Sequence, residues 1–139
     1  MSALFKKLNL TDQKSIVICN APDTFEAELA ALKGVEVVRD PKSPKAILFA
    51  LGFAVTQAEL DRTSKLLAAG AQGDAILWFA YPKGSSKRYR CEFNRDSGWD
   101  VIKKAGFDSV RMVAIDEDWS ALRFRRTDFI KGMTRKGKK

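Results

Sequence analysis

Residues 15–19 read Ser-Ile-Val-Ile-Cys, residues 46–51 read Ala-Ile-Leu-Phe-Ala-Leu, and residues 74–80 read Asp-Ala-Ile-Leu-Trp-Phe-Ala. Short apolar runs of this kind, in which polar residues do not alternate, are typical of strands buried on both faces of a parallel sheet. The run at 46–51 is wholly apolar, which favours a central place in the sheet. These three stretches predict the core of an α/β domain.

Helical patterns separate the predicted strands. The predicted helices run from Asp23 to Gly34, from Thr56 to Gly70, and from Asp96 or Ser97 to Gly106. The pairs Asp23 with Glu26 and Thr56 with Glu59 have the spacing of a capping box, and a glycine is a common residue just after a helix. Strands that alternate with helices imply parallel strands, right-handed crossovers and a three-layer domain.

Three more strands are predicted, at residues 35–38, 109–115 and 120–126. The last two flank an acidic turn at 116–118, which suits an antiparallel pair. The link at 39–45 is short, because seven residues at ~3.4 Å each reach only about 24 Å. It must be nearly extended if the strands at 35–38 and 46–51 are parallel, and an antiparallel hairpin is the alternative.

The sequence therefore predicts a single Rossmann-like α/β domain over residues 1–128. Its sheet is mostly parallel, with about six strands and an antiparallel pair at the C-terminal end. The remaining residues, 129–139, are basic and lack apolar periodicity, so we expect a flexible tail.

Composition excludes several kinds of site and protein. The 139 residues include no histidine, which excludes a Ser-His-Asp triad and every histidine-dependent metal site. The two cysteines are too few for a disulfide framework, and they form no Cys-x-x-Cys zinc motif. No apolar run approaches the ~18 residues that span a bilayer, and residues 1–10 lack the apolar centre of a signal peptide. We expect a soluble, cytoplasmic protein.

The formal net charge of +8 is unevenly distributed. Residues 123–139 contain eight basic residues and one acidic residue, a net charge of +7. Such a segment can neutralise phosphates and bind nucleic acid in a salt-sensitive way, and a solvated tail is the alternative. The candidate nucleic-acid contacts are Arg123, Arg125, Arg126, Lys131, Arg135 and Lys136.

The segment 81–87, Tyr-Pro-Lys-Gly-Ser-Ser-Lys, follows a predicted central strand, where open α/β sheets form ligand crevices. In this segment Lys83 and Lys87 can pair with a phosphate or carboxylate. Ser85 and Ser86 can donate hydrogen bonds, and Tyr81 can stack on a base. We predict an anion-binding loop here, with a flexible basic loop that binds nothing as the alternative.

Two other features are weaker candidates for chemistry. Three consecutive carboxylates at 116–118 do not converge readily on one metal ion, so a solvated turn is the favoured interpretation and no metal site is predicted. Cys19 lies in the first strand and is expected to be a small buried apolar residue. Cys91 lies near three arginines, which favour its thiolate, and we expect a reactive but non-catalytic thiol.

The order of elements resembles the class I methyltransferase fold with one strand-helix unit removed, over about residues 10–128. The chain also resembles a family of small bacterial proteins of unknown function that look like shortened methyltransferases. That resemblance rests on residues 77–83 (Leu-Trp-Phe-Ala-Tyr-Pro-Lys), 95–96 (Arg-Asp) and 116–124 (Asp-Glu-Asp-Trp-Ser-Ala-Leu-Arg-Phe). It implies a fold and no particular activity.

An S-adenosylmethionine enzyme of this fold is expected to have a glycine-rich turn after its first strand. Residues 20–23 read Asn-Ala-Pro-Asp, without glycine, and Pro22 has no amide N–H. Asn20 and Asp40 are the remaining candidates for cofactor contacts, since Asp40 follows the second strand, where such folds place an acid for ribose hydroxyls. The alternative for Asp40 is an ordinary exposed loop residue.

Three functions follow from these observations. The favoured one is a methyltransferase-like binding or accessory protein for an anionic ligand, without the usual cofactor turn. The second is an S-adenosylmethionine-dependent methyltransferase with an atypical turn at 20–23. The third is a basic, nucleic-acid-associated protein in which residues 83–95 and 123–139 form one face. No catalytic residue and no membrane contact are predicted.

Overall fold

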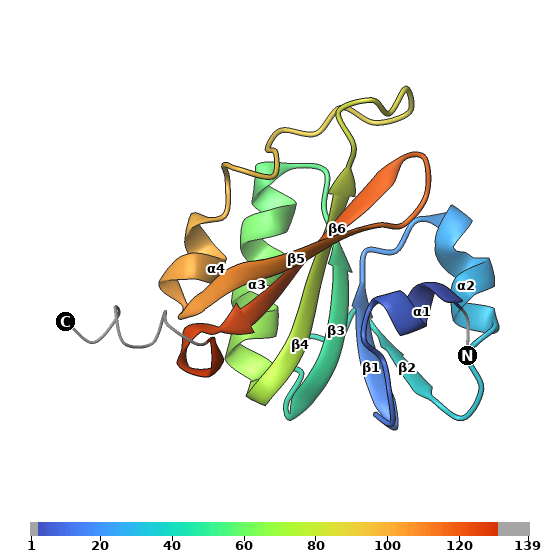
Figure 1. The fold of residues 1–139 in the computed structure, drawn as a ribbon, viewed down its shortest axis with the longest axis vertical. Coiled ribbons are helices and arrows are strands. Elements are labelled where there is room, and N and C mark those ends of the chain that lie inside the picture. Colours follow the sequence, from blue (N-terminus) through green and yellow to red (C-terminus); the bar gives the residue numbers. More distant parts are fainter. Residues whose placement is uncertain (1–2, 131–139) are drawn as a thin grey trace.

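The computed structural model describes residues 3–130, whose strands form one six-stranded sheet of order β2-β1-β3-β4-β6-β5 (Figure 1). The strands are β1 (Ser15–Cys19), β2 (Glu36–Arg39), β3 (Ile47–Phe53), β4 (Ala71–Pro82), β5 (Phe107–Ala114) and β6 (Trp119–Arg126). Strands β1 to β4 are parallel, and β6 is antiparallel to both β4 and β5. The predicted α/β fold with its C-terminal antiparallel pair is confirmed.

Helices cover both faces of this sheet, which gives the three predicted layers. The helices are α1 (Ala3–Lys7), α2 (Glu26–Ala30), α3 (Gln57–Gly70) and α4 (Asp100–Lys104), with short 3-10 turns η1 (Asp23–Phe25) and η2 (Thr127–Phe129). Helices α1 and α2 lie on one side, and α3 and α4 lie on the other (Figure 1). Within residues 3–130 no helix is long and apolar enough to cross a membrane.

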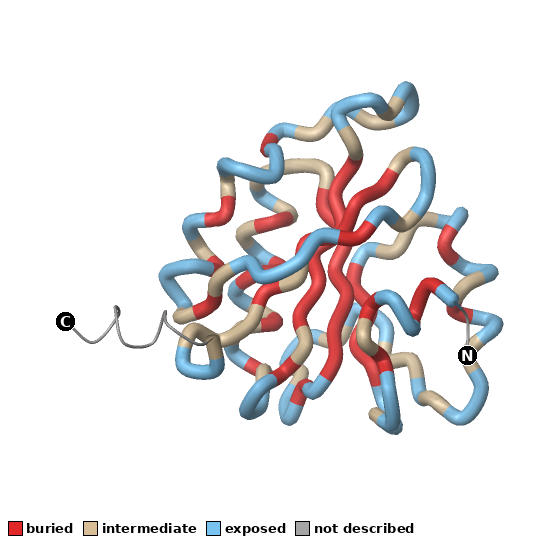
Figure 2. Tube along the Cα trace, viewed as in Figure 1, coloured by how far each residue is buried: buried red, intermediate tan, exposed pale blue. Residues whose placement is uncertain are grey.

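The core consists of two apolar layers, one on each face of the sheet. Phe5, Phe49 and Phe53 belong to the layer under α1 and α2, and Leu67 and Phe79 belong to the layer under α3 and α4. Figure 2 shows that the buried residues follow the central strands β3 and β4. Burial on both faces explains the apolar runs at residues 49–53 of β3 and 75–80 of β4.

Strands β2 and β3 lie on either side of β1, and each pairs with it in parallel. They therefore do not form a hairpin with each other. Residues 40–46 connect them and bend at both ends, since Asp40 and Ala46 have φ angles of 45° and 54°. The link passes close to the end of α3, where a Cβ on Gly70 would collide with the carbonyl oxygen of Pro44. A glycine at the end of α3 therefore makes room for this link.

The start of α2 differs from the prediction. No side chain caps this helix, which follows the 3-10 turn η1 and ends at Ala30 rather than Gly34. Instead of reaching back to Asp23, the carboxylate of Glu26 accepts two hydrogen bonds from Arg39, at 2.7 and 2.8 Å. The predicted capping box is wrong here because a guanidinium on β2 binds the carboxylate.

The two other predicted caps have different outcomes. The capping box of α3 is confirmed, with Glu59 N donating to Thr56 Oγ1 and Thr56 N donating to Glu59 Oε1, both at 3.1 Å. For α4, neither Asp96 nor Ser97 is the cap, because the helix begins after Trp99 and no side chain caps it. The backbone N–H groups of both residues donate instead to Asn94 Oδ1.

Candidate functional site

A cavity of about 790 Å³ opens at the carboxyl end of β4, between residues 83–95 and strands β5 and β6. Three cationic side chains line it, those of Lys83, Arg90 and Arg95, together with apolar and aromatic groups that include Tyr81, Cys91, Phe93 and Met112. Glu92 is the one carboxylate among the described lining residues, and its Oε1 accepts a hydrogen bond from Gln57 N at 2.8 Å. The cavity therefore has an excess of positive charge.

Tyr81 forms the floor of this cavity because β4 extends two residues beyond its predicted end at 80. Its ring packs against Phe93 and Trp99, with ring centroids 5.9 and 5.8 Å away, and its hydroxyl donates to Met112 Sδ at 3.5 Å. Burial raises the pKa of Tyr81, while the charge of Arg95 acts in the opposite direction. The positive charge of Arg95 therefore acts on the Tyr81 hydroxyl in the cavity lining.

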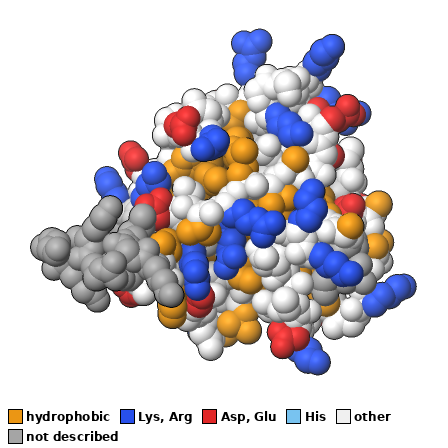
Figure 3. Space-filling view, viewed as in Figure 1, with side chains coloured by type: hydrophobic (Ala, Val, Ile, Leu, Met, Phe, Trp, Pro, Cys, Tyr) orange, Lys and Arg blue, Asp and Glu red, His pale blue; other side chains and the backbone are white. Residues whose placement is uncertain are grey.

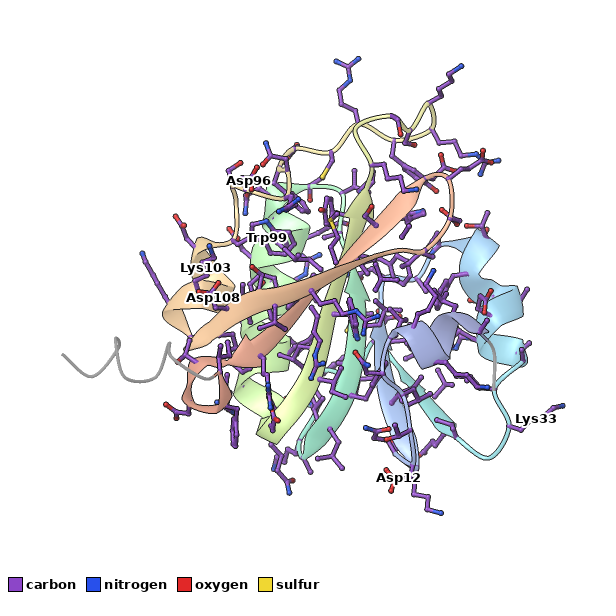
Figure 4. All side chains as sticks on the ribbon, in the orientation of Figure 1. Asp12, Lys33, Asp96, Trp99, Lys103 and Asp108 are labelled. Carbon is purple, nitrogen blue, oxygen red and sulfur yellow. The ribbon has the colours of Figure 1, made fainter. Side chains whose placement is uncertain are left out.

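Trp99 contacts the C-terminal end of the 83–95 segment. It is buried, and its Nε1 donates to the carbonyl oxygen of Asn94 at 2.8 Å (Figure 4). An isolated antiparallel bridge between Asn94 and Ser97 holds the same turn. These contacts fix the end of the 83–95 segment that carries Arg95.

The other end of the segment is fixed by the turn between β5 and β6. Ser86 Oγ donates to Asp118 Oδ1 at 2.9 Å, and Lys83 N donates to the carbonyl oxygen of Asp118 at 2.8 Å. Ser86 Oγ also accepts hydrogen bonds from the backbone N–H groups of Arg88 and Tyr89. Ser86 lines the cavity, but its hydroxyl is already bonded within the protein.

The predicted binding-loop residues fall into two groups. Tyr81, Lys83 and Ser86 line the cavity, whereas Ser85 and Lys87 are exposed and lie outside it. The structure adds Arg90 and Arg95 as cationic lining residues, which the sequence did not mark as part of the binding loop. Their position depends on how the segment returns to the end of β4, where Phe93 packs against Tyr81, and the sequence has no local signal for this.

The acidic turn at 116–118 has a structural role. Asp116 Oδ1 accepts from the backbone N–H groups of Asp118 and Trp119, at 2.8 and 2.9 Å. Asp118 holds the 83–86 segment as described above, and Arg88 lies 3.9 Å from its carboxylate. Within residues 3–130 no group of three or more metal-ligating side chains is placed to hold an ion.

The expectation of an acidic thiol at Cys91 is wrong. Burial raises its pKa, and this effect outweighs hydrogen bonds from the backbone of Phe93 and Glu92 that act in the opposite direction. Cys19 is buried as predicted, and burial together with the charge of Asp40 raises its pKa to about 11. Burial therefore disfavours the thiolate of both cysteines.

Asn20 and Asp40 come together at the carboxyl ends of β1 and β2. Asn20 N donates to Asp40 Oδ1 at 2.8 Å, and Asn20 Nδ2 donates to the carbonyl oxygen of Phe53 at 3.0 Å and to Thr63 Oγ1 at 3.2 Å. Both residues line a second cavity of about 350 Å³, beside Lys42. The side-chain amide of Asn20 thus connects the end of β1 to β3 and α3. A cofactor at this turn would find that amide already hydrogen-bonded within the protein.

The basic residues of β6 point to different partners. Arg125 forms two hydrogen bonds with Asp74, at 2.7 and 2.8 Å. Arg126 donates to the carbonyl oxygens of Ala71 and Gly73 and lies over the ring of Phe107. Three other nucleic-acid candidates, Lys131, Arg135 and Lys136, lie outside the described residues.

The described parts of the two basic segments do not form one face. Strand β6 is antiparallel to β4, with Trp119 opposite Pro82 and Phe124 opposite Leu77. Residues 83–95 follow Pro82, so they lie at one end of the sheet and Arg125 and Arg126 lie at the other. The antiparallel direction of β6, together with the length of β4, separates them.

Comparisons with known proteins support the fold and no further assignment. No protein-family model matches the chain, and no curated protein matches it. The structure is similar to an S-adenosylmethionine-dependent methyltransferase from Aquifex aeolicus, with a TM-score of 0.62 and 13% identity over 88% of this chain and 87% of that one. The chain thus shares the architecture of class I methyltransferases over most of its length.

Two further structures show the same similarity. The pyocyanin biosynthetic protein PhzM has a TM-score of 0.58 and 14% identity, over 89% of this chain and 54% of that one. The N-methyltransferase NodS from Bradyrhizobium japonicum has a TM-score of 0.56 and 10% identity, over 88% of this chain and 92% of that one. The chain has a methyltransferase-like α/β fold, and the narrower resemblance to small bacterial proteins stays a prediction.

Proposed function

We propose that this protein is a methyltransferase-like binding or accessory domain that binds a small anionic ligand in the cavity at the end of β4. The observation that carries the proposal is the charge of the lining. Lys83, Arg90 and Arg95 line the cavity, and the single lining carboxylate, Glu92, already accepts a backbone hydrogen bond. A bound anion would compensate this excess of positive charge.

The rest of the lining indicates what such an anion would carry. Tyr81, Phe93 and Met112 provide apolar surface beside the cations, and Ser120 provides a hydroxyl. Pockets that combine apolar walls with a few polar groups bind small organic molecules. An arginine can bind two oxygens of a carboxylate or phosphate in parallel, while a lysine acts as a point charge. A phosphate or carboxylate attached to an apolar group fits this lining.

The experiment is a calorimetric titration of the full chain with citrate, inorganic phosphate and adenosine monophosphate. The test variants are Lys83→Ala and Arg95→Ala, and the matched control is Lys87→Ala, which removes the same charge from the same segment outside the cavity. We expect at least one probe to bind, with affinity reduced about tenfold or more in the test variants, or about 1.4 kcal/mol. Equal affinity in the Lys83 and Lys87 variants, or no binding of any probe, contradicts the proposal.

A second candidate is an S-adenosylmethionine-dependent methyltransferase with an atypical cofactor turn. It is favoured by Asp40, which lies beside Asn20 at the ends of β1 and β2, and by the cavity of about 350 Å³ there. The missing glycine and the bonded Asn20 side chain do not match the usual cradle. Titration with S-adenosylhomocysteine separates the two candidates, since this one requires binding that Asp40→Ala weakens and Lys83→Ala does not.

A further inference from the structure

Arg111 and Arg123 are directly opposite each other in the antiparallel pair formed by β5 and β6. They lie on the face of the sheet that also carries Val113 and Ala121, which pack in the layer under α1 and α2. The cavity at the end of β4 takes Met112 and Ser120 from the same strands, and these point to the other face because side chains alternate along a strand. The arginine pair is therefore separate from the proposed ligand cavity.

The contacts of this pair are unusual for two cations. Arg111 Nη1 and Arg123 Nη1 both donate to the same neutral acceptor, Asn9 Oδ1, each at 3.3 Å. Asn9 lies just after α1 and has a φ angle of 68°. One amide oxygen thus holds two guanidinium groups together without neutralising either charge.

No carboxylate within residues 3–130 forms an ion pair with either arginine. The acid whose charge acts on Arg123 is Asp74, and both of its oxygens are bonded to Arg125. Lys7 adds a further cation on this side, where its Nζ lies 3.5 Å from the carbonyl oxygen of Ala114. Figure 3 shows Lys and Arg side chains in a row over β5 and β6.

Arg123 is half-buried, and its Nε is inaccessible and has no hydrogen-bond partner among the described residues. Its pKa is lowered by burial first, and then by the charges of Arg125 and Arg111, against the opposing effect of Asp74. Like charges directly opposite each other on neighbouring strands destabilise a sheet, and a buried donor without a partner adds to that cost. Within residues 3–130 no carboxylate pairs with either arginine, so the charge of Asp74 is the opposing effect on Arg123.

We propose that Arg111 and Arg123 form a binding site for a phosphate group on this face. A phosphate offers three or four oxygens and up to two negative charges, so it can bridge two guanidinium forks and match their charge. A carboxylate has two oxygens and one charge, which suffice for one fork. Arg111 is exposed, so the site is open to a free phosphate, a phosphate monoester or the phosphodiester of a nucleic acid.

The test locates phosphate binding by chemical shifts of backbone amides in the full, isotope-labelled chain. The probes are inorganic pyrophosphate and a single-stranded oligothymidine, each titrated at two salt concentrations. The charge-removing variants are Arg111→Gln alone and with Arg123→Gln. The matched controls are Lys33→Gln alone and with Lys103→Gln, because Figure 4 shows Lys33 in the loop after α2 and Lys103 on α4, both away from β6.

We expect amides of β5 and β6 around Arg111 and Arg123 to shift, with affinity reduced tenfold or more by Arg111→Gln and unchanged by Lys33→Gln. Saturable binding of pyrophosphate at these amides identifies the ligand class of the site as a free phosphate or a phosphate monoester. Binding of the oligonucleotide alone, with a salt dependence that falls in the arginine variants, assigns a phosphodiester. Shifts confined to residues 83–95, or no shift with either probe, overturn the proposal without affecting the proposed ligand cavity.

Arg123 also holds the residues after α1 through Asn9, so the double variant is checked by circular dichroism before titration. If it does not fold, the exposed Arg111→Gln variant decides the question, because Arg123 and its bond to Asn9 stay in place. A purely structural role for the pair predicts lower stability with no phosphate-dependent shift, and that result would also overturn the proposal.

Discussion

The backbone N–H of Asn20 donates to the carboxylate of Asp40 at 2.8 Å, and this bond joins the turns that follow β1 and β2. The asparagine side chain continues the connection to β3 and α3. In a methyltransferase-like fold these turns meet at the point where open α/β sheets bind ligands. Here the meeting point is occupied by an internal hydrogen-bond network, which directs attention to the neighbouring cavity at the end of β4.

Asn20→Ala is expected to lower the free energy of unfolding by about 2–3 kcal/mol, because it removes two hydrogen bonds of about 1 kcal/mol each and places alanine at positive φ. Asn20→Gly loses the same bonds without the backbone strain, so it should cost about 1 kcal/mol less. Urea denaturation of the three proteins measures both terms. Equal stability of the alanine and glycine variants would contradict the strained φ.

Ser86→Ala is expected to release the 83–89 segment, since it removes the bond to Asp118 and the two backbone bonds that Ser86 Oγ accepts. Trypsin should cleave after the basic residues of this segment several times faster, with a loss of global stability of only about 1 kcal/mol. Ser85→Ala is the control, because Ser85 is the exposed neighbour. If both variants are cleaved at the rate of the parent, Ser86 does not hold the segment.

Gly70→Ala is expected to destabilise the protein by about 1–3 kcal/mol, although alanine normally favours a helix over glycine. The added methyl group would collide with the carbonyl of Pro44 in the link between β2 and β3. Gly84→Ala has open space around it and should be close to neutral. Thermal unfolding of both variants checks the sign, and a stabilised Gly70→Ala protein would refute the close approach.

The capping box of α3 should make stability depend on pH in the acid range. Hydrogen bonds from the backbone of Val55 and Thr56 lower the pKa of Glu59 below its ordinary value of 4.5. Because the folded-state pKa is the lower one, this contribution is complete above 4.5 and is lost as the pH falls through the folded-state value.

Glu59→Gln removes this titration, so the stability difference between parent and variant should shrink between pH 6 and about pH 3. Urea midpoints across this range provide the measurement. The control is Glu117→Gln, at an exposed position of the β5–β6 turn, whose difference from the parent should not follow the same profile. A constant difference for Glu59→Gln would show that its carboxylate charge does not contribute.

Sequence reasoning succeeded where the signal is local. The strand at 15–19 and the capping box of Thr56 and Glu59 were predicted as they are found, because apolar runs and cap spacing act over a few residues. The cap of α2 was predicted wrongly because the competing partner of Glu26, Arg39, lies on a different element. Asn20 and Asp40 were named as separate candidates for cofactor contacts, and the structure adds the hydrogen bond between them.

The two cationic sites could not be predicted fully from the sequence. Lys83 was predicted from its place after a central strand, but Arg90 and Arg95 line the cavity because the segment returns to the end of β4, where Phe93 packs against Tyr81. The pairing of Arg111 with Arg123 depends on an irregularity in register between Ser109 and Arg111. A shift of one residue changes which side chains share a face, and the sequence pattern does not specify it.

Strand β4 pairs on one side with β6, which follows β5 in the sequence. While the protein is being synthesised, β4 therefore has an open edge until residues 119–126 are available. That edge includes a buried apolar stretch, from Leu77 to Tyr81, and unpaired apolar edges promote association between chains. A nascent chain that stalls before Trp119 is consequently prone to aggregation, and completion of β6 is the step that ends this risk.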